Sequence, residues 1–108
     1  MRLIDMSAEE MLESLEEAQK ATIRAEQRYM LAKARLTAVE GAVIDELKRQ
    51  GLSVEVSKRL MWDQEALKSA HREYLKIWGA WQAAKAEQML ARDQMEMWRT
   101  VRADARRV

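Results

Sequence analysis

The strongest constraint in this sequence is a seven-residue repeat of apolar and small side chains that runs through two segments of the chain. Within each segment these residues alternate at steps of four and three, and only Gly51-Leu52-Ser53 separates the segments. This spacing predicts two long helices, each of which buries one seam against a partner helix. The first seam comprises Met11, Leu15, Ala18, Thr22, Ala25, Tyr29, Ala32, Leu36, Val39 and Val43, and the second comprises Leu60, Leu67, Ala70, Tyr74, Ile77, Trp81, Ala84, Ala91, Met95, Trp98 and Ala105.

The boundaries of the first helix follow from residues that favour helix ends. Ser7 is followed three residues later by Glu10, which is the pattern of a capping box. Gly51 can adopt the left-handed conformation that ends a helix. We therefore expect a helix over about residues 7–50 and a turn at about 51–53.

The second helix is expected as one continuous element over about residues 54–107. Ser53 is its natural N-cap, and Ser57 is a second candidate. If Ser57 were the cap, Val54 and Val56 would lie in an extended connector, because β-branched residues lose side-chain freedom in a helix. The sequence leaves both alternatives open.

The composition agrees with few, long elements. The chain has no Pro and three Gly, which leaves little material for turns. A short connection makes the two helices neighbours. We predict an all-α fold with a single domain, residues 1–108, formed by a long antiparallel two-helix hairpin that resembles a coiled coil.

The register of this hairpin can be predicted by folding the chain about its turn. Paired residues then have numbers that add to about 104. Tyr29 falls near Tyr74, and Met6 falls near Trp98. Small residues of the first helix face large residues of the second, which lets the layers interdigitate.

A second set of apolar side chains lies outside both seams, where one hairpin cannot cover it. Two helices bury little surface for a chain of this size, and there is no Cys to form a disulfide. We therefore expect self-association, with dimerisation of two hairpins into a four-helix bundle as the favoured form. Trp78 and Trp98 suit the core or a self-interface, whereas Trp62 suits an external partner equally well. The candidate self-association or partner face comprises residues outside the seams together with the seam residue Trp98: Leu12, Ile23, Met30, Ile44, Trp62, Leu75, Trp78, Leu90, Met97, Trp98 and Val101.

The sequence contains no pattern typical of catalysis. Without Cys there is no thiolate zinc site and no cysteine nucleophile. The single histidine, His71, has no Glu three residues before it, so the paired motif of a di-metal bundle is missing. No glycine-rich phosphate loop occurs. We expect a non-enzymatic protein with no cofactor and no metal.

Direct nucleic-acid binding is the alternative function. Basic residues recur along both helices at spacings that could follow a phosphate backbone. The same rows are typical of the flanking positions of a coiled coil, where they face acidic residues of the other helix. The formal net charge of +1 favours the second interpretation. The rows comprise Lys20, Arg24 and Arg28; Lys68, Arg72 and Lys76; and Arg92, Arg99 and Arg106.

The expected compartment is the cytoplasm. The first residues lack the apolar core of a signal peptide. No uncharged stretch approaches the roughly 20 apolar residues that a membrane helix needs. We expect no membrane partner.

The second helix resembles a group of small proteins encoded by phages and prophages. The resemblance rests on the segment from Tyr74-Leu75 through residues 81–87 to Met97-Trp98-Arg99. Such proteins are helical hairpins that are often encoded near replication and recombination genes. The uncovered apolar faces lead us to expect a self-associating protein that binds a protein partner, and the resemblance implies that it is an accessory factor in nucleic-acid metabolism. A purely structural spacer or assembly protein is a further alternative.

Overall fold

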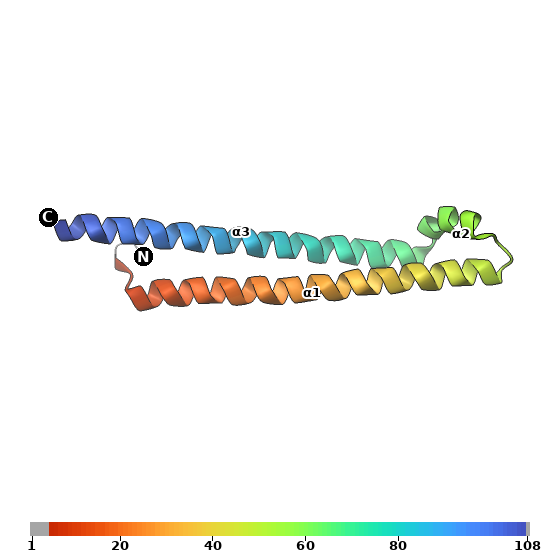
Figure 1. Cartoon of the computed structure of the whole chain (residues 1–108), viewed down its shortest axis with the longest axis horizontal. Helices are drawn as coiled ribbons and strands as arrows, with labels where there is room; N and C mark the ends of the chain where they lie inside the picture. Colours follow the sequence, from red (N-terminus) through yellow and green to blue (C-terminus); the bar gives the residue numbers. More distant parts are fainter. Residues whose placement is uncertain (1–4, 108) are drawn as a thin grey trace. The chain divides into compact units, whose positions relative to one another are not determined.

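The computed structural model describes residues 5–107, and every regular element in this range is helical. The chain forms α1 (Ala8–Arg49), α2 (Val54–Leu60), a single 3₁₀ turn η2 (Met61–Asp63) and α3 (Glu65–Arg107) (Figure 1). The all-α class predicted from the sequence is confirmed.

The chain divides into two compact units, and each contains part of α1 and part of α3. Unit 1 comprises the residues up to Ala25 together with those from Trp81 onward, and unit 2 comprises Glu26–Ala80. Within each unit the segment of α1 runs antiparallel to the segment of α3 (Figure 1). The predicted antiparallel pairing of two long helices is confirmed.

The start of α1 is capped as predicted. The Ser7 Oγ accepts a hydrogen bond from the Glu10 backbone N–H at 3.1 Å. The Ser7 carbonyl accepts another from the Met11 N–H at 3.1 Å. Glu9 and Glu10 lie in the first turn, where negative charge complements the helix dipole.

The end of α1 forms a Schellman motif. Gly51 has a φ of 93°, which only glycine adopts without strain. The Gly51 N–H donates to the Lys48 carbonyl at 2.9 Å, and the Leu52 N–H donates to the Leu47 carbonyl at 3.3 Å. These two bonds satisfy carbonyls that the helix end would otherwise leave without partners.

The connection that follows begins with a cap. The Ser53 Oγ accepts a hydrogen bond from the Val56 N–H at 3.2 Å, so Ser53 is the N-cap of α2. Val54 and Val56 are therefore helical. Ser57, the alternative cap, lies inside α2 with 0% exposure, and its Oγ has no hydrogen-bond partner among the described residues.

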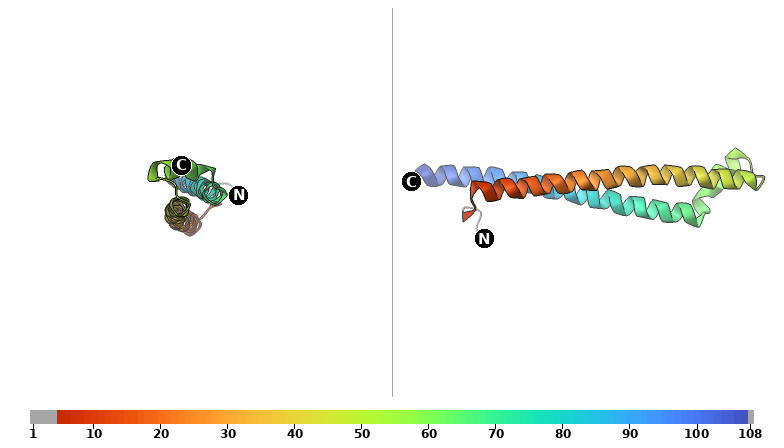
Figure 2. Two further views of the ribbon diagram at one scale, coloured as in Figure 1. Left: turned by 90° about the vertical axis from the view of Figure 1, so that its right-hand side faces the viewer. Right: turned by 90° about the horizontal axis from the view of Figure 1, so that it is seen from below.

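The expected single helix over residues 54–107 is wrong in one place, because the chain breaks between α2 and α3 (Figure 2). The apolar spacing of the seam is interrupted at this point. The positions that should continue the apolar seam between Leu60 and Leu67 hold the polar residues Asp63 and Gln64. A continuous helix would have to place these polar groups in the seam, where they lose water without gaining a partner.

Gln64 forms the junction between the 3₁₀ turn and α3. Its backbone is extended, with ψ 131°, and its N–H donates to the Met61 carbonyl at 3.1 Å. Its own carbonyl accepts from the Leu67 and Lys68 N–H groups, both at 3.1 Å. The residue thus closes the 3₁₀ turn and opens α3.

Candidate interaction surfaces

The seam of unit 1 is built from small side chains and polar links to the backbone. The Thr22 Oγ1 donates to the Ala84 carbonyl on α3 at 3.1 Å, and lies 2.9 Å from the Ala18 carbonyl on its own helix. The Trp98 Nε1–H donates to the Met6 carbonyl at 2.8 Å, which agrees with the predicted register. The buried apolar residues of this unit are Met11, Ala91 and Met95.

Unit 2 is held instead by rings and a fully buried leucine. Tyr29 and Tyr74 pair across the seam as predicted, with ring centroids 5.6 Å apart and hydroxyl oxygens 3.2 Å apart. The hydrogen bond between the two hydroxyls is the main cause that raises the pKa of Tyr74. Leu67 has 0% exposure.

The aromatic layer of unit 2 extends to the break in the chain. His71 stacks on Tyr74 at 6.3 Å between ring centroids, and Trp62 meets His71 edge to face at 5.4 Å. Trp62 remains 43% exposed. The lone histidine is therefore part of an aromatic stack, and within residues 5–106 no three His, Asp or Glu side chains gather as a metal site would require.

The apolar residues predicted outside the seams are mostly exposed. The eight exposed members have exposed fractions of 43% to 60%. Burial inside one chain therefore does not explain them, and they remain available for a partner. The exposed members are Leu12, Ile23, Met30, Trp62, Leu75, Trp78, Leu90 and Met97.

Three members of the predicted face are half-buried within the chain: Ile44, Trp98 and Val101. Trp98 is used internally, since its indole binds the Met6 carbonyl. The guanidinium carbon of Arg102 also lies 5.3 Å from its ring centroid. Trp98 is therefore primarily an anchor within unit 1.

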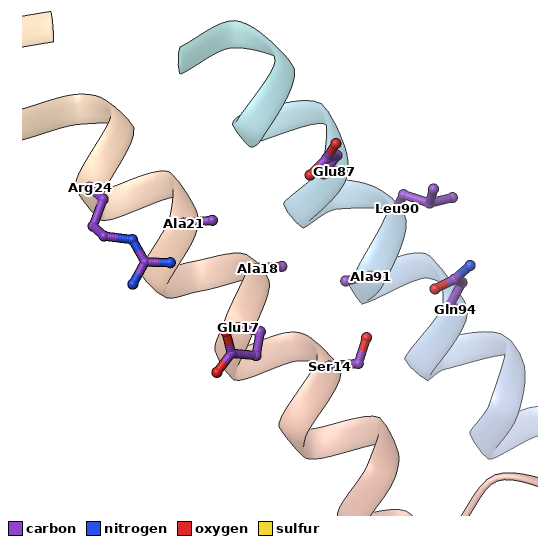
Figure 3. Close-up of a pocket in the computed structure, with 9 residues that line it drawn as sticks. All are labelled: Ser14, Glu17, Ala18, Ala21, Arg24, Glu87, Leu90, Ala91 and Gln94. Atoms are coloured by element: carbon purple, nitrogen blue, oxygen red, sulfur yellow. The ribbon is translucent and has the colours of Figure 1, made fainter. Parts of the chain in front are cut away.

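A groove of about 380 Å³ opens between α1 and α3 in unit 1 (Figure 3). Its floor is made by small side chains, because Ser14, Ala18 and Ala21 follow one another on one face of α1 and Ala91 faces them from α3. The remaining lining residues form the rim: Glu17, Arg24, Glu87, Leu90 and Gln94.

The rim of this groove carries unpaired charges of both signs. Within residues 5–106, Glu17, Arg24 and Glu87 take part in no ion pair. The Leu90 side chain on the α3 border points away from α1 and is 57% exposed (Figure 3). The groove therefore has a floor of small side chains and a largely polar rim, with a protruding leucine beside it.

A smaller groove of about 160 Å³ lies in unit 2. It is lined by Arg28, Leu31, Ala32, Arg35 and Ile77. Leu31 is 71% exposed, the largest exposure among the large apolar side chains of residues 5–106. The two arginines make this groove more basic than the one in unit 1.

All residues of the predicted basic rows are exposed. Two of them pair along their own helix: Arg72 with Glu65 at 2.8 Å, and Arg99 with Glu96 at 3.4 Å. The hydrogen bond from Arg72 and its charge hold the pKa of Glu65 below its ordinary value. In the part of the chain from 5 to 106 no ion pair joins α1 to α3, so the expected pairing of these rows with the facing helix is not formed.

Sequence reasoning missed several exposed apolar side chains. Leu31 is 71% exposed and Met89 is 63% exposed, and both are absent from the predicted seams and from the candidate face. Leu60, expected in the second seam, is 38% exposed because it lies just before the break. The loss of the seven-residue apolar spacing after Leu60 is the sequence signal that could have indicated this break.

Comparison with protein families, curated proteins and solved structures finds no match to this chain. In residues 5–107, neither long helix carries an apolar stretch sufficient to span a bilayer. The function has to be argued from the surfaces themselves.

Proposed function

We propose that this chain is a non-enzymatic helical interaction protein that self-associates and binds a protein partner. The observation that carries the proposal is the set of large apolar side chains left in water, including Leu90, Met97 and Leu31. Large apolar side chains that are exposed in patches mark interaction sites in soluble proteins.

The exposed area supports the same proposal. The chain exposes 8134 Å². A compact monomer of its mass, 12.6 kDa, exposes about 6,200 Å². The excess of about 1,900 Å² is larger than the roughly 800 Å² per partner that a standard interface buries.

The simplest assembly is a dimer in which two antiparallel helix pairs form a four-helix bundle. Such a dimer would cover apolar faces that a single chain leaves in water, and burial of this surface would stabilise the folded chain. We propose that the external protein partner acts in nucleic-acid metabolism, as the resemblance to small phage helical hairpins implies.

Sedimentation equilibrium over a range of protein concentrations tests the proposal. We expect a mass of twice 12.6 kDa that falls toward a single chain on dilution, with helix content decreasing in parallel. A mass of one chain at high concentration, with full helix content in circular dichroism, would contradict self-association.

Direct nucleic-acid binding is the second candidate, and one observation favours it. The basic rows are exposed and make no ion pair between α1 and α3 among residues 5–106, so Lys20, Arg28 and Arg92 have no acidic partner across the seam. Free basic side chains at helical spacing can neutralise phosphates.

Binding to single- and double-stranded DNA at low and high salt separates the two candidates. A direct binder would show an affinity that falls steeply with salt, because each phosphate contact releases a counterion. A protein-binding module would show little affinity at either salt concentration.

A further inference from the structure

We propose that one side of α1 is a self-recognition surface, on which two copies of this chain pair antiparallel through charges of opposite sign. This surface would bring about the self-association proposed above, on which the inference rests. Its residues follow one another beside the seam at steps of four and three, and every member except the half-buried Ala21 is exposed. We call this row the charged flank, and it comprises Glu10, Ser14, Glu17, Ala21, Arg24, Arg28, Leu31 and Arg35.

The charges of this flank are separated by sign along the helix. The first two, Glu10 and Glu17, are acidic, and the three that follow, Arg24, Arg28 and Arg35, are basic. Within residues 5–106 none of these five side chains takes part in an ion pair. A single chain therefore presents an acidic segment and a basic segment on the same row of α1, and neutralises neither.

This order makes the charged flank complementary to a copy of itself. When two such helices run antiparallel with residue numbers that add to about 45, each glutamate of one copy meets an arginine of the other. A two-fold dimer repeats every contact, so four pairs of opposite charge form and no like charges are paired. The paired positions are Glu10 with Arg35, Ser14 with Leu31, Glu17 with Arg28, and Ala21 with Arg24.

The row on the other side of the α1 seam does not have this property. Its charged residues at the same spacing are Glu9, Glu16, Glu26, Lys33 and Glu40. Because this row holds one basic residue, no antiparallel register can neutralise more than one of its glutamates. Charge complementarity with a second copy therefore selects the charged flank.

Two charges on α3 agree with the same two-fold axis. The axis passes α1 beside Thr22, whose Oγ1 donates to the Ala84 carbonyl of α3. The midpoint between Lys76 and Glu87 lies within about three residues of Ala84, so the rotation brings Lys76 of one copy to the level of Glu87 of the other. Glu87 lines a groove together with Glu17, which places it on the side of the charged flank, and Lys76 follows at steps of four and three.

The experiment measures the dimer dissociation constant of the full chain and of charge-reversed variants by sedimentation equilibrium at low salt. Glu17→Arg sets two like charges together at both Glu17–Arg28 contacts of the dimer, and Arg28→Glu does the same with the opposite sign. We expect each change to raise the dissociation constant at least about tenfold. Added salt should reduce both effects.

Restoration of opposite charges distinguishes a contact between copies from a change within one chain. In an equimolar mixture of Glu17→Arg and Arg28→Glu chains, both contacts of a mixed dimer again join opposite charges. The double variant Glu17→Arg/Arg28→Glu restores them as well. Each should dimerise within about threefold of wild type. The two positions lie about 16 Å apart along α1, which is too far for an ion pair inside one chain.

The matched controls make the same changes of charge on the other row of α1. Glu16→Arg and Lys33→Glu alter exposed residues outside the charged flank. Each should leave the dissociation constant within about threefold of wild type. Controls that weaken the dimer as much as Glu17→Arg and Arg28→Glu would show an effect of net charge alone and would overturn the inference.

The remaining outcomes separate this inference from the proposed function. A wild-type chain that stays monomeric would overturn both. A dimer that is equally stable in Glu17→Arg and Arg28→Glu would keep self-association but overturn the charged flank as its surface. If either variant loses helix content in circular dichroism, regain of helicity in the mixture supports the inference. A loss of dimer or of helicity that neither the mixture nor the double variant restores overturns it.

Discussion

Units 1 and 2 follow the same seven-residue repeat, yet they fill their seams in different ways. Unit 2 buries large side chains, with Leu67 fully enclosed and Tyr29 against Tyr74. Unit 1 buries Met11 and Met95 but elsewhere presents alanines and a threonine, and it uses hydrogen bonds to the backbone carbonyls of Ala84 and Met6. The seven-residue repeat therefore determines that two helices pair. The size of the side chains determines whether they fill the space between the two helices.

The difference suggests that the two units are stabilised in different ways. Buried apolar volume stabilises unit 2 without a partner, because large side chains interdigitate at core density. Unit 1 keeps a groove that only another molecule can fill. Segments with few buried apolar contacts lie at the low end of local stability, where binding surfaces are commonly found.

The largest expected effect is in unit 2. Leu67→Ala should lower the free energy of unfolding by about 2–5 kcal/mol, because it leaves a cavity at a site with 0% exposure. Urea unfolding at fixed protein concentration measures the change. Leu31→Ala is the matched control, since Leu31 is 71% exposed and should change stability by about 0.5 kcal/mol or less. Equal effects of the two variants would show that burial of Leu67 is not what stabilises unit 2.

A smaller effect is expected from the anchor of unit 1. Trp98→Phe keeps an aromatic ring but removes the N–H that binds the Met6 carbonyl. The free energy of unfolding should fall by about 1 kcal/mol, the usual net contribution of one hydrogen bond. Trp78→Phe provides the comparison, because Trp78 is 45% exposed. Chemical denaturation should rank Trp98→Phe as the more destabilising of the two.

Ser57→Ala should act in the opposite direction. The hydroxyl is buried in α2 and its Oγ has no partner among the described residues, so the folded state loses its hydration without compensation. Removing it should raise the free energy of unfolding by about 0.5–1 kcal/mol. The exposed Ser69 is the control site. A destabilised Ser57→Ala variant would show that the hydroxyl has a role in the folded chain.

The smallest expected effect concerns the pH dependence of unit 2. The hydrogen bond with Tyr29 raises the pKa of Tyr74 above its ordinary value of 10.0. The folded state therefore holds this proton more tightly than the unfolded state. Its contribution to stability is present below pH 10.0 and is lost as the pH rises through the folded pKa. In Tyr29→Phe the alkaline absorbance titration of Tyr74 should move toward lower pH, and an unchanged titration would contradict this cause.

Much of the fold could be predicted from the sequence because its signals are local. Ser7, Gly51 and Ser53 act through their own backbone neighbourhoods, and the register follows from the length of the turn. The break at Gln64 was missed, since the predicted helix was continued through a polar step in the seam.

The groove was not predictable in the same way. The sequence places Ala18 and Ala91 in opposing seams, but the hollow depends on where Leu90 points, which is a property of the folded pair. The exposed fraction of a side chain is likewise a property of the folded helix pair. The seam pattern places Leu60 in the second seam, whereas 38% of this residue is exposed.

The placement of the tryptophans gives each unit its own optical signal. Trp98 and Trp81 lie in unit 1, whereas Trp62 and Trp78 lie in unit 2. Lys85 Nζ lies 4.0 Å from the Trp81 ring centroid, and the Trp62 ring meets His71, so the indoles sit in chemically distinct surroundings. Variants that retain one tryptophan each would let fluorescence follow the melting of one unit at a time, and would report whether the small-residue pair opens before the aromatic one.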